Sequence, residues 1–137
     1  AMIVPYSAFQ AKDDKWLIIA AGNDHLFEKL SRALGHEEWA RDERFVTNAG
    51  RLVHREELER MISDAVRLHD SDHWIRLLEA EGIPVAPIQD VEELTRDPQF
   101  LASGMVQTLE HPRIKGFKSI GIPIKIDDER PPLRMMP

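Results

Sequence analysis

The histidines are the first residues whose type and spacing could do chemistry. His69 and His73 are four residues apart in the sequence HDSDH, which places two potential metal ligands on one face of a helix. Ser71 and Asp72, however, are typical of a helix N-cap, so a helix boundary is expected between the two histidines. The segment also lacks the glutamate of the HExxH zinc motif. We therefore interpret it as an exposed junction between helices and predict no metal site in this chain.

Adjacent carboxylates are a second candidate, because paired acids can act as general acid and general base. That chemistry needs a cleft in which the pKa of one group is displaced. The pairs in this chain fall in predicted turns or on polar helix faces, and we expect four of the five to be solvated. The pairs are Asp13 and Asp14, Glu37 and Glu38, Glu56 and Glu57, Glu92 and Glu93, and Asp127 and Asp128.

Nucleophiles and phosphate-binding loops are missing from the sequence. It contains no cysteine, no serine in a GxSxG elbow, and neither the GxGxxG nor the GxxxxGK[ST] loop. Arg51, at the head of a predicted helix, could bind a phosphate or a partner's carboxylate, although a structural ion pair is the favoured interpretation. The residues by themselves thus supply no catalytic set, and we expect no cofactor to be bound by this chain.

The composition limits the class of protein. At 137 residues the chain is one domain or a piece of a larger protein, and its 42% hydrophobic content is typical of a globular fold. The net charge of −6, with acidic and basic residues interspersed, argues against a nucleic-acid partner. No apolar run approaches the roughly 18 residues that a membrane helix needs, and no signal peptide is visible. We expect a cytoplasmic protein without a membrane partner.

The stretch from Tyr6 to Gly35 predicts the elements around which the chain is organised. Alternating residues over 6–10 and a short apolar run over 16–21 are typical of two strands joined by a tight turn. Asn23 or Asp24 can then cap an amphipathic helix, which the glycine at the end of the stretch would terminate. A hairpin that leads into a helix is the start of an α+β layer.

The rest of the chain predicts helices followed by strands. The α+β fold we expect is a small antiparallel sheet, built from the N-terminal hairpin and the C-terminal strands, covered by four to five helices. Prolines make the segment 83–88 extended, because they exclude a helix. The other expected elements are helices from the Thr47–Asn48 cap to His69 and over 73–80, short helical turns at 37–40, 91–95 and from Pro98, and strands at 105–110 and 117–126.

Several stretches, in order and over about nine-tenths of the chain, give it a resemblance to a known family. The sequence resembles the class III CoA-transferases, which include formyl-CoA transferase, the L-carnitine CoA-transferase and bile-acid-inducible group, and α-methylacyl-CoA racemase. The matching stretches are WLIIAAGNDHLFEKL at 16–30, ERFVTNAGR at 43–51, WIRLLEAEGIPVAPI at 74–88, DVEELTRDPQFLASGM at 90–105 and GIPIKI at 121–126.

The resemblance covers only part of such an enzyme. It implies a small domain at 1–119 and an extended return segment at 120–137 that would pack on a large domain. In the family that large domain carries the CoA site and the catalytic aspartate, so no catalytic residue is assigned in this chain. The implied substrates are an acyl-CoA thioester and a carboxylic acid. The implied partners are the large domain of the same enzyme and a second copy in a homodimer.

The resemblance also suggests four substrate-binding positions. Tyr6 matches an aromatic residue beside the acyl pocket, and Ala21, Gly22 and Asn23 match a wall of the active-site cleft. The racemase has a glutamate where Asn23 stands, and an amide cannot hold the charge of a proton relay. From the residues alone, the favoured role of Asn23 is a helix N-cap, and Tyr6 can equally be a half-buried strand residue.

The function that follows from the resemblance is that of an incomplete enzyme. We expect the C-terminal part of an acyl-CoA transferase that moves CoA between carboxylic acids through an acyl-aspartate and a CoA-thioester intermediate. The isolated chain should be inactive. The alternatives are a stand-alone binding or assembly module that docks on a separately encoded large domain, a fragment of a racemase-type isomerase, and an independent CoA-binding protein.

Overall fold

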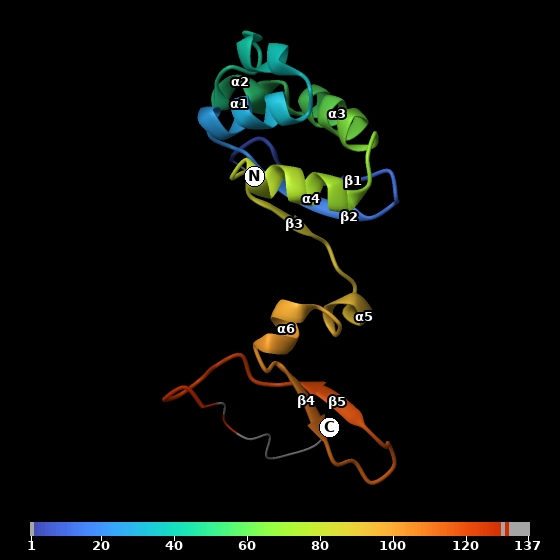
Figure 1. The fold of residues 1–137 in the computed structure, drawn as a ribbon. Coiled ribbons are helices and arrows are strands. Elements are labelled where there is room, and N and C mark those ends of the chain that lie inside the picture. Colours follow the sequence, from blue (N-terminus) through green and yellow to red (C-terminus); the bar gives the residue numbers. More distant parts are fainter. Residues whose placement is uncertain (1, 130, 132–137) are drawn as a thin grey trace. The chain divides into compact units, whose positions relative to one another are not determined.

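The computed structural model describes residues 2–129 and 131, which fall into two compact units (Figure 1). The first unit spans Ala1–Ile88 and the second spans Gln89–Pro137. Each unit has its own helices and its own antiparallel sheet, so the α+β class expected from the sequence is confirmed.

The first unit begins with the expected hairpin. Strand β1 (Tyr6–Gln10) pairs antiparallel with β2 (Trp16–Ala20). In the turn between them, Asp14 has a φ of 62°, a left-handed conformation that aspartate tolerates better than most residues. The hairpin therefore closes tightly without a glycine in its turn.

A third strand completes this sheet. β3 (Val85–Pro87) pairs antiparallel with β2, giving the order β1-β2-β3, and the N–H of Ile88 donates to the carbonyl oxygen of Trp16 at 2.8 Å. The predicted extended segment is thus confirmed. The C-terminal strands, expected in the same sheet, form a separate one. The reason is proximity along the chain, since the left-handed turn at Gly82 brings β3 back beside β2 directly after a helix.

The helices of the first unit lie between β2 and β3 in the chain. Gly35 has a φ of 80°, the left-handed conformation that commonly follows a helix end, as predicted. The single long helix expected up to His69 is divided at His54, where φ is −103° and ψ is 27°, and neither proline nor glycine stands next to this break. The helices are α1 (Asp24–Ala33), the 3-10 helix η1 (Glu37–Arg41), α2 (Asn48–Val53), α3 (Arg55–Val66) and α4 (Ser71–Ala80).

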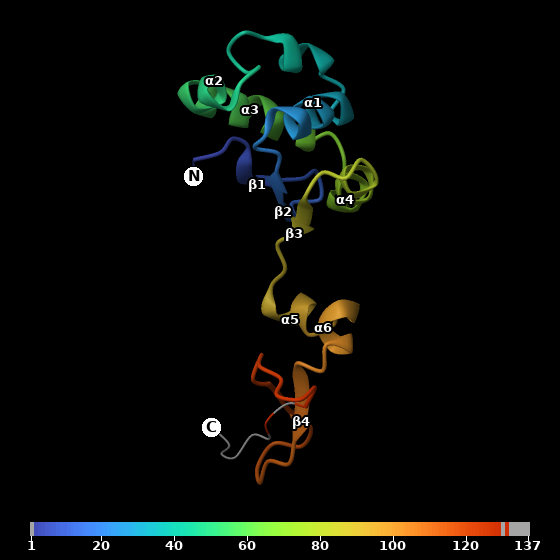
Figure 2. The same cartoon turned by 90° about the vertical axis from the view of Figure 1, so that its left-hand side faces the viewer.

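The core of the first unit lies on one face of its sheet. Figures 1 and 2 show α1 and α3 on this side, with α4 alongside β2 and β3. Side chains alternate between the two faces of a strand, so one face of the sheet turns Phe9, Leu17 and Ile19 inward. They meet buried residues of the three helices, among them Phe27, Leu30, Leu58, Ile62, Trp74 and Leu78.

The opposite face of the sheet is apolar but uncovered by the first unit. Tyr6 of β1 and Trp16 of β2 point to this side and are 46% and 47% exposed. Ile88, which follows β3, is 49% exposed. The first unit therefore has a closed core on one side and an open apolar surface on the other.

The second unit consists of short elements. The predicted helical turns at 91–95 and from Pro98 are confirmed: Asp90 caps the first and forms a capping box with Glu93, and Asp97 caps the second, whose first residue is Pro98. The last strand, expected over 117–126, ends at Ile120, because a glycine and a proline follow it. The elements are α5 (Val91–Leu94), α6 (Pro98–Ala102), β4 (Val106–Leu109) and β5 (Phe117–Ile120), and the two strands pair antiparallel.

Among the described residues of the second unit, 89–129 and 131, the only buried one is Gly121, which has no side chain. Its isoleucines are exposed, for example Ile120 at 53% and Ile124 at 61%. The predicted boundary between a small domain at 1–119 and a return segment at 120–137 concerns packing on a domain outside this chain, and it stays a prediction. Positions 130 and 132–137 of that segment lie outside the described residues.

Candidate functional site

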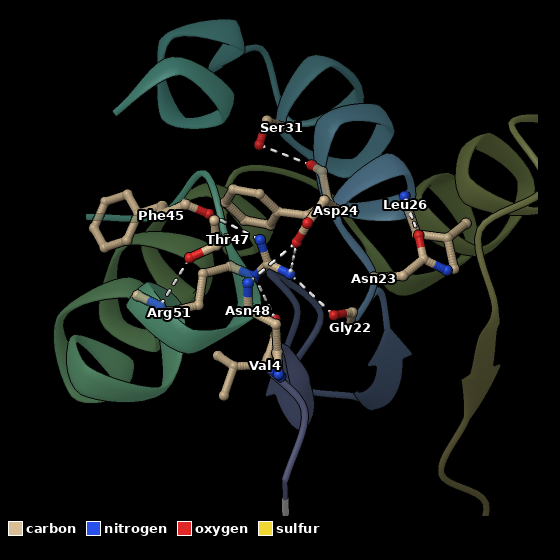
Figure 3. Close-up of polar contacts among 12 residues, drawn as sticks. Val4, Gly22, Asn23, Asp24, Leu26, Ser31, Phe45, Thr47, Asn48 and Arg51 are labelled. Atoms are coloured by element: carbon tan, nitrogen blue, oxygen red, sulfur yellow. Dashed lines mark hydrogen bonds and ion pairs between the residues drawn. The ribbon is translucent and has the colours of Figure 1, made fainter. Parts of the chain in front are cut away.

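The turn after β2 contains three of the four predicted substrate-binding positions. Asn23 is the N-cap of α1, with φ of −88° and ψ of 159°, and its Oδ1 accepts the N–H of Leu26 at 2.8 Å (Figure 3). The structural interpretation of Asn23 is therefore confirmed. Its side chain is exposed, and within the described part of the chain its Nδ2 group has no acceptor, so it can donate to a ligand.

Tyr6 lies at the same end of the hairpin as this turn. It stands opposite Ala20, and the N–H of Ala21 donates to the carbonyl oxygen of Pro5 at 3.0 Å. The phenol is half-exposed on the open face of the sheet. Ala21 and Gly22 are buried, so neither presents a side chain to a ligand. The structure thus brings the four positions together but exposes only the side chains of Tyr6 and Asn23.

Position 22 requires a glycine because another segment of the chain packs against it. A Cβ added at this glycine would lie 2.6 Å from the Cβ of Ile3. Carbon atoms without a bond between them do not approach so closely, so the turn accepts only glycine unless Ile3 moves. Residues 3–5, which lead into β1, therefore lie directly against the candidate site.

Beneath this turn is a buried arginine that holds three segments of the chain. Arg51 of α2 is completely buried and donates to the carbonyl oxygens of Val4 at 2.7 Å, Phe45 at 2.8 Å and Gly22 at 2.9 Å (Figure 3). It also forms an ion pair of 2.9 Å with Asp24. The predicted structural ion pair of Arg51 is confirmed, and its charge is not available to a phosphate.

The buried charge is accommodated by its surroundings. Burial lowers the pKa of Arg51, and the hydrogen bond and negative charge of Asp24 offset part of that effect. The guanidinium remains protonated at neutral pH, since arginine does not lose its proton in proteins. The ring of Phe27 lies 4.5 Å from the guanidinium carbon and adds a cation–π contact.

Asn48 ties the same segments together from the first turn of α2. Its Oδ1 accepts the N–H of Val4 at 3.0 Å, and its Nδ2 donates to the carbonyl oxygen of Met2 at 3.1 Å. Its backbone N–H donates to Asp24 Oδ1 at 3.1 Å. We call Asp24, Asn48 and Arg51 the polar clamp.

Sequence reasoning predicts an ion pair for Arg51 but misses the other contacts of the polar clamp. The acceptors of Arg51 are carbonyl oxygens at positions 4, 22 and 45, whose meeting depends on the tertiary fold. A weak signal is present in the sequence TNAGR at 47–51. It places an asparagine and an arginine three residues apart, on one face of a helix.

The histidine pair lies at a helix junction, as predicted. The rings of His69 and His73 stack with their centroids 4.2 Å apart, and α4 begins between them, at Ser71. Asp70, not the predicted Ser71 or Asp72, is the N-cap residue. Across residues 2–129 and 131, no group of three or more histidine, cysteine or acidic side chains is arranged to hold a metal ion.

The shifted carboxyl groups do not suit acid catalysis. Hydrogen bonds from the Arg44 side chain lower the pKa of Asp42 to about 2. The backbone N–H of Phe100 lowers the pKa of Asp97, which caps α6. Both shifts keep the carboxylate ionised, whereas a general acid needs a raised pKa.

A hollow of about 630 Å³ opens beside α1, next to the candidate site. Its lining contains both acidic and basic side chains, so the charges of the lining do not select an anion or a cation. Its lining residues are Asp24, His25, Glu28, Arg32, Glu37, Ala40, Arg41 and Val46.

Comparison with known proteins relates this fold to one enzyme family. The model of CoA-transferase family III matches residues 1–137. The chain belongs to CoA-transferase family III. Its relatives in this family include an acetyl-CoA:oxalate CoA-transferase from Acetobacter aceti, 36% identical over 134 residues, and a human succinyl-CoA:glutarate CoA-transferase, 30% identical over 135 residues.

The family III chain is much shorter than these relatives. The matches cover 94% and 95% of this chain but 33% and 31% of the two relatives, so the chain spans about a third of their length. A solved CAIB/BAIF family protein from Brucella suis is 35% identical with a TM-score of 0.81, and the match covers 93% of this chain and 32% of that one. A Mycobacterium tuberculosis protein with a TM-score of 0.83 is 20% identical and supports the fold alone.

No helix within residues 2–129 and 131 is both long enough and apolar enough to cross a bilayer.

Proposed function

We propose that this chain is the C-terminal small domain of an enzyme that transfers CoA from an acyl-CoA thioester to a carboxylic acid. The observation that carries the proposal is that the family model matches the whole chain, whereas the chain spans about a third of its relatives. CoA transfer would proceed through an acyl-aspartate and a CoA-thioester intermediate on an aspartate outside these residues. No catalytic residue of that step is assigned here, and the chain alone is inactive.

The names of the relatives support this substrate class. One pairs acetyl-CoA with oxalate, and another pairs succinyl-CoA with glutarate. Each pair consists of a CoA thioester and a carboxylic acid, which matches the donor and acceptor expected from the sequence.

The candidate site contributes a wall of the acyl pocket in this proposal. Tyr6 and Asn23 supply exposed side chains, and the buried Ala21 and Gly22 supply the backbone of the turn. The Nδ2 group of Asn23 can donate to a carbonyl or carboxylate oxygen. A neutral amide suits binding but not proton transfer, which favours a transferase over a racemase.

The open surfaces support a role as part of a larger assembly. The uncovered sheet face of the first unit carries Tyr6 and Trp16, and the second unit has no buried side chain among its described residues. Apolar surfaces of this kind commonly pack against other protein. The proposed partners are the large domain of the same enzyme and a second copy in a homodimer. A cytoplasmic location without membrane or nucleic-acid partners stays a prediction.

The proposal is tested by measuring CoA exchange. The probes are acetyl-CoA with oxalate, succinyl-CoA with glutarate, and a panel of other carboxylic acids, with the CoA esters separated by liquid chromatography. We expect exchange by the full product of the source gene and none by the 137-residue chain alone. Exchange by the chain alone, or no exchange by the full product with any acid, would overturn the proposal.

Two further measurements separate the alternatives. Reading the source gene upstream of this chain distinguishes a continuous enzyme from a module that docks on a separately encoded large domain. Incubating the full product with a 2-methylacyl-CoA in D₂O distinguishes a racemase, because deuterium would enter the α-carbon. We expect a continuous reading frame and no deuterium.

A further inference from the structure

The position of Arg51 raises the question of why a charge is buried under the candidate site. Its side chain is completely buried, and three of its four acceptors are neutral carbonyl oxygens. The carboxylate partner, Asp24, has a side chain that is 61% exposed, so the ion pair is only partly removed from water. A buried charge is expensive to desolvate, and well-packed apolar residues are often at least as stabilising. Stability alone therefore does not explain an arginine here.

The geometry of the guanidinium explains why the residue is an arginine. Nε donates to Val4, Nη1 to Phe45, and Nη2 to both Gly22 and Asp24. These four acceptors lie on three segments of the chain, because Gly22 and Asp24 belong to the same turn. A planar fork with five N–H donors can reach all of them at once, whereas the compact ammonium of lysine cannot.

The contacts of Arg51 enclose one residue of the candidate site. Gly22 precedes Asn23 and Asp24 follows it, and Arg51 holds the carbonyl of the first and the carboxylate of the second. Asn48 holds the same carboxylate through its backbone N–H. The carbonyl group of Gly22 and the side chain of Asp24, on either side of Asn23, are therefore both held, while the exposed side chain of Asn23 is directed toward Leu26 (Figure 3).

We propose that Arg51 is a positioning residue of the transferase site: it fixes Gly22 and Asp24 on either side of Asn23 and so sets how this turn meets the acyl group of the substrate. This inference rests on the proposed function. Arg51 touches no substrate itself. Because it also holds the carbonyl of Val4, the segment that leads into β1 shares the same anchor as the turn.

The first experiment measures the turn in the 137-residue chain and needs no activity. Arg51→Lys keeps the charge and removes the fork. We expect amide exchange at Ala21 and Leu26, whose N–H groups donate to Pro5 and Asn23, to accelerate by roughly tenfold more than exchange in the core. The control is Ile62→Val, a buried substitution in α3 that should change exchange throughout the unit evenly. An even change in Arg51→Lys as well would overturn the proposal.

The second experiment measures kinetics with the full product of the source gene. Arg51→Lys should raise KM for the acyl-CoA donor by about tenfold and leave kcat within about threefold, because the turn binds substrate without taking part in the chemical step. Ile62→Val should leave both constants unchanged. An unchanged KM in Arg51→Lys overturns this inference even if the unsubstituted enzyme transfers CoA. Absence of transfer by the unsubstituted enzyme overturns the proposed function instead.

A milder pair of variants keeps the test decisive if Arg51→Lys does not fold. Asp24→Ala removes the carboxylate that accepts hydrogen bonds from Arg51 and from the backbone N–H of Asn48. Because the side chain of Asp24 is largely exposed, we expect this variant to fold. Asp24→Asn restores an Oδ1 acceptor. We expect a raised KM in Asp24→Ala and its recovery in Asp24→Asn. An equal KM in the two variants would contradict a positioning role.

Discussion

At the scale of single residues, Asn23 combines a structural and a proposed functional role. Its Oδ1 caps α1, so Asn23→Ala should lower the free energy of unfolding by about 1 kcal/mol, whereas Asn23→Asp should leave it nearly unchanged. Urea denaturation of both variants at pH 7 provides the measurement. Equal stability of the two variants would show that the cap contributes nothing.

Gly50 is a residue at which helix propensity and tertiary structure predict opposite signs. Propensity alone predicts that Gly50→Ala stabilises α2 by about 1 kcal/mol. A Cβ at this position, however, would lie 2.5 Å from the carbonyl oxygen of Arg44, which belongs to the backbone and cannot rotate away. We expect a net loss of about 1–3 kcal/mol in the free energy of unfolding, measured by urea denaturation. A stabilised variant would mean that the segment around Arg44 yields easily.

These residues also mark what sequence can reveal. The cap at Asn23 depends on residues three positions apart, and a local pattern predicts it. The acceptors of Arg51 and the neighbour of Gly50 come from other segments, and no local pattern specifies them. The sequence thus predicts local contacts such as this cap, whereas contacts between distant segments are specified only by the fold.

At the scale of elements, the β1–β2 turn is joined to the start of α4. Asp13 accepts the N–H of Ser71 at 3.2 Å and its hydroxyl at 2.7 Å. Desolvation opposes ionisation of this carboxyl and is the largest single effect, but the hydrogen bonds from Ser71, together with those from the backbone of Lys15 and of Asp13 itself, lower the pKa of Asp13 below its usual 3.8. A group whose pKa is lower in the folded state stabilises the fold above its unfolded pKa, and this contribution disappears as pH falls through the folded pKa.

The resulting prediction concerns acid stability. The stability advantage of the wild type over Asp13→Asn should be largest above about pH 5 and should shrink as pH falls below 3.8. Urea unfolding at a series of pH values from 6 to about 2 gives this difference, in which the other carboxyl groups largely cancel. If the difference were the same at every pH, the carboxylate of Asp13 would not be the group that joins the turn to α4.

The elements were predictable to the extent that their signals are local. The hairpin, the helix starts near positions 23, 47, 90 and 97, and the extended segment at 83–88 follow from turn, capping and proline chemistry. Strand partners are different, because the residues of a short strand do not specify which other strand it pairs with. Only the fold decides that β3 pairs with β2 and that β4 pairs with β5.

At the scale of the whole molecule, all buried apolar side chains of the described residues lie between Val4 and Ile83. We therefore expect a chain truncated after Ile88 to unfold cooperatively, with a free energy within about 0.5 kcal/mol of that of the full chain. The segment 89–137 made alone should show no cooperative transition by circular dichroism. A clear loss of stability on truncation would mean that the second unit supports the first.

The two edges of the three-stranded sheet have a consequence for aggregation. Strands with free edges recruit strands from other molecules. In β3, the backbone groups of Val85 and Pro87 point away from β2, toward the free edge. Proline has no N–H, so only the N–H of Val85 remains as a donor at this edge. Beside β1, Arg67 and Glu59 of the neighbouring helical segment bind Gln10 and Ser7 and obstruct an approaching strand. Growth of this sheet into fibrils by edge-to-edge pairing is thus disfavoured at both edges, although one of its faces is uncovered by the first unit.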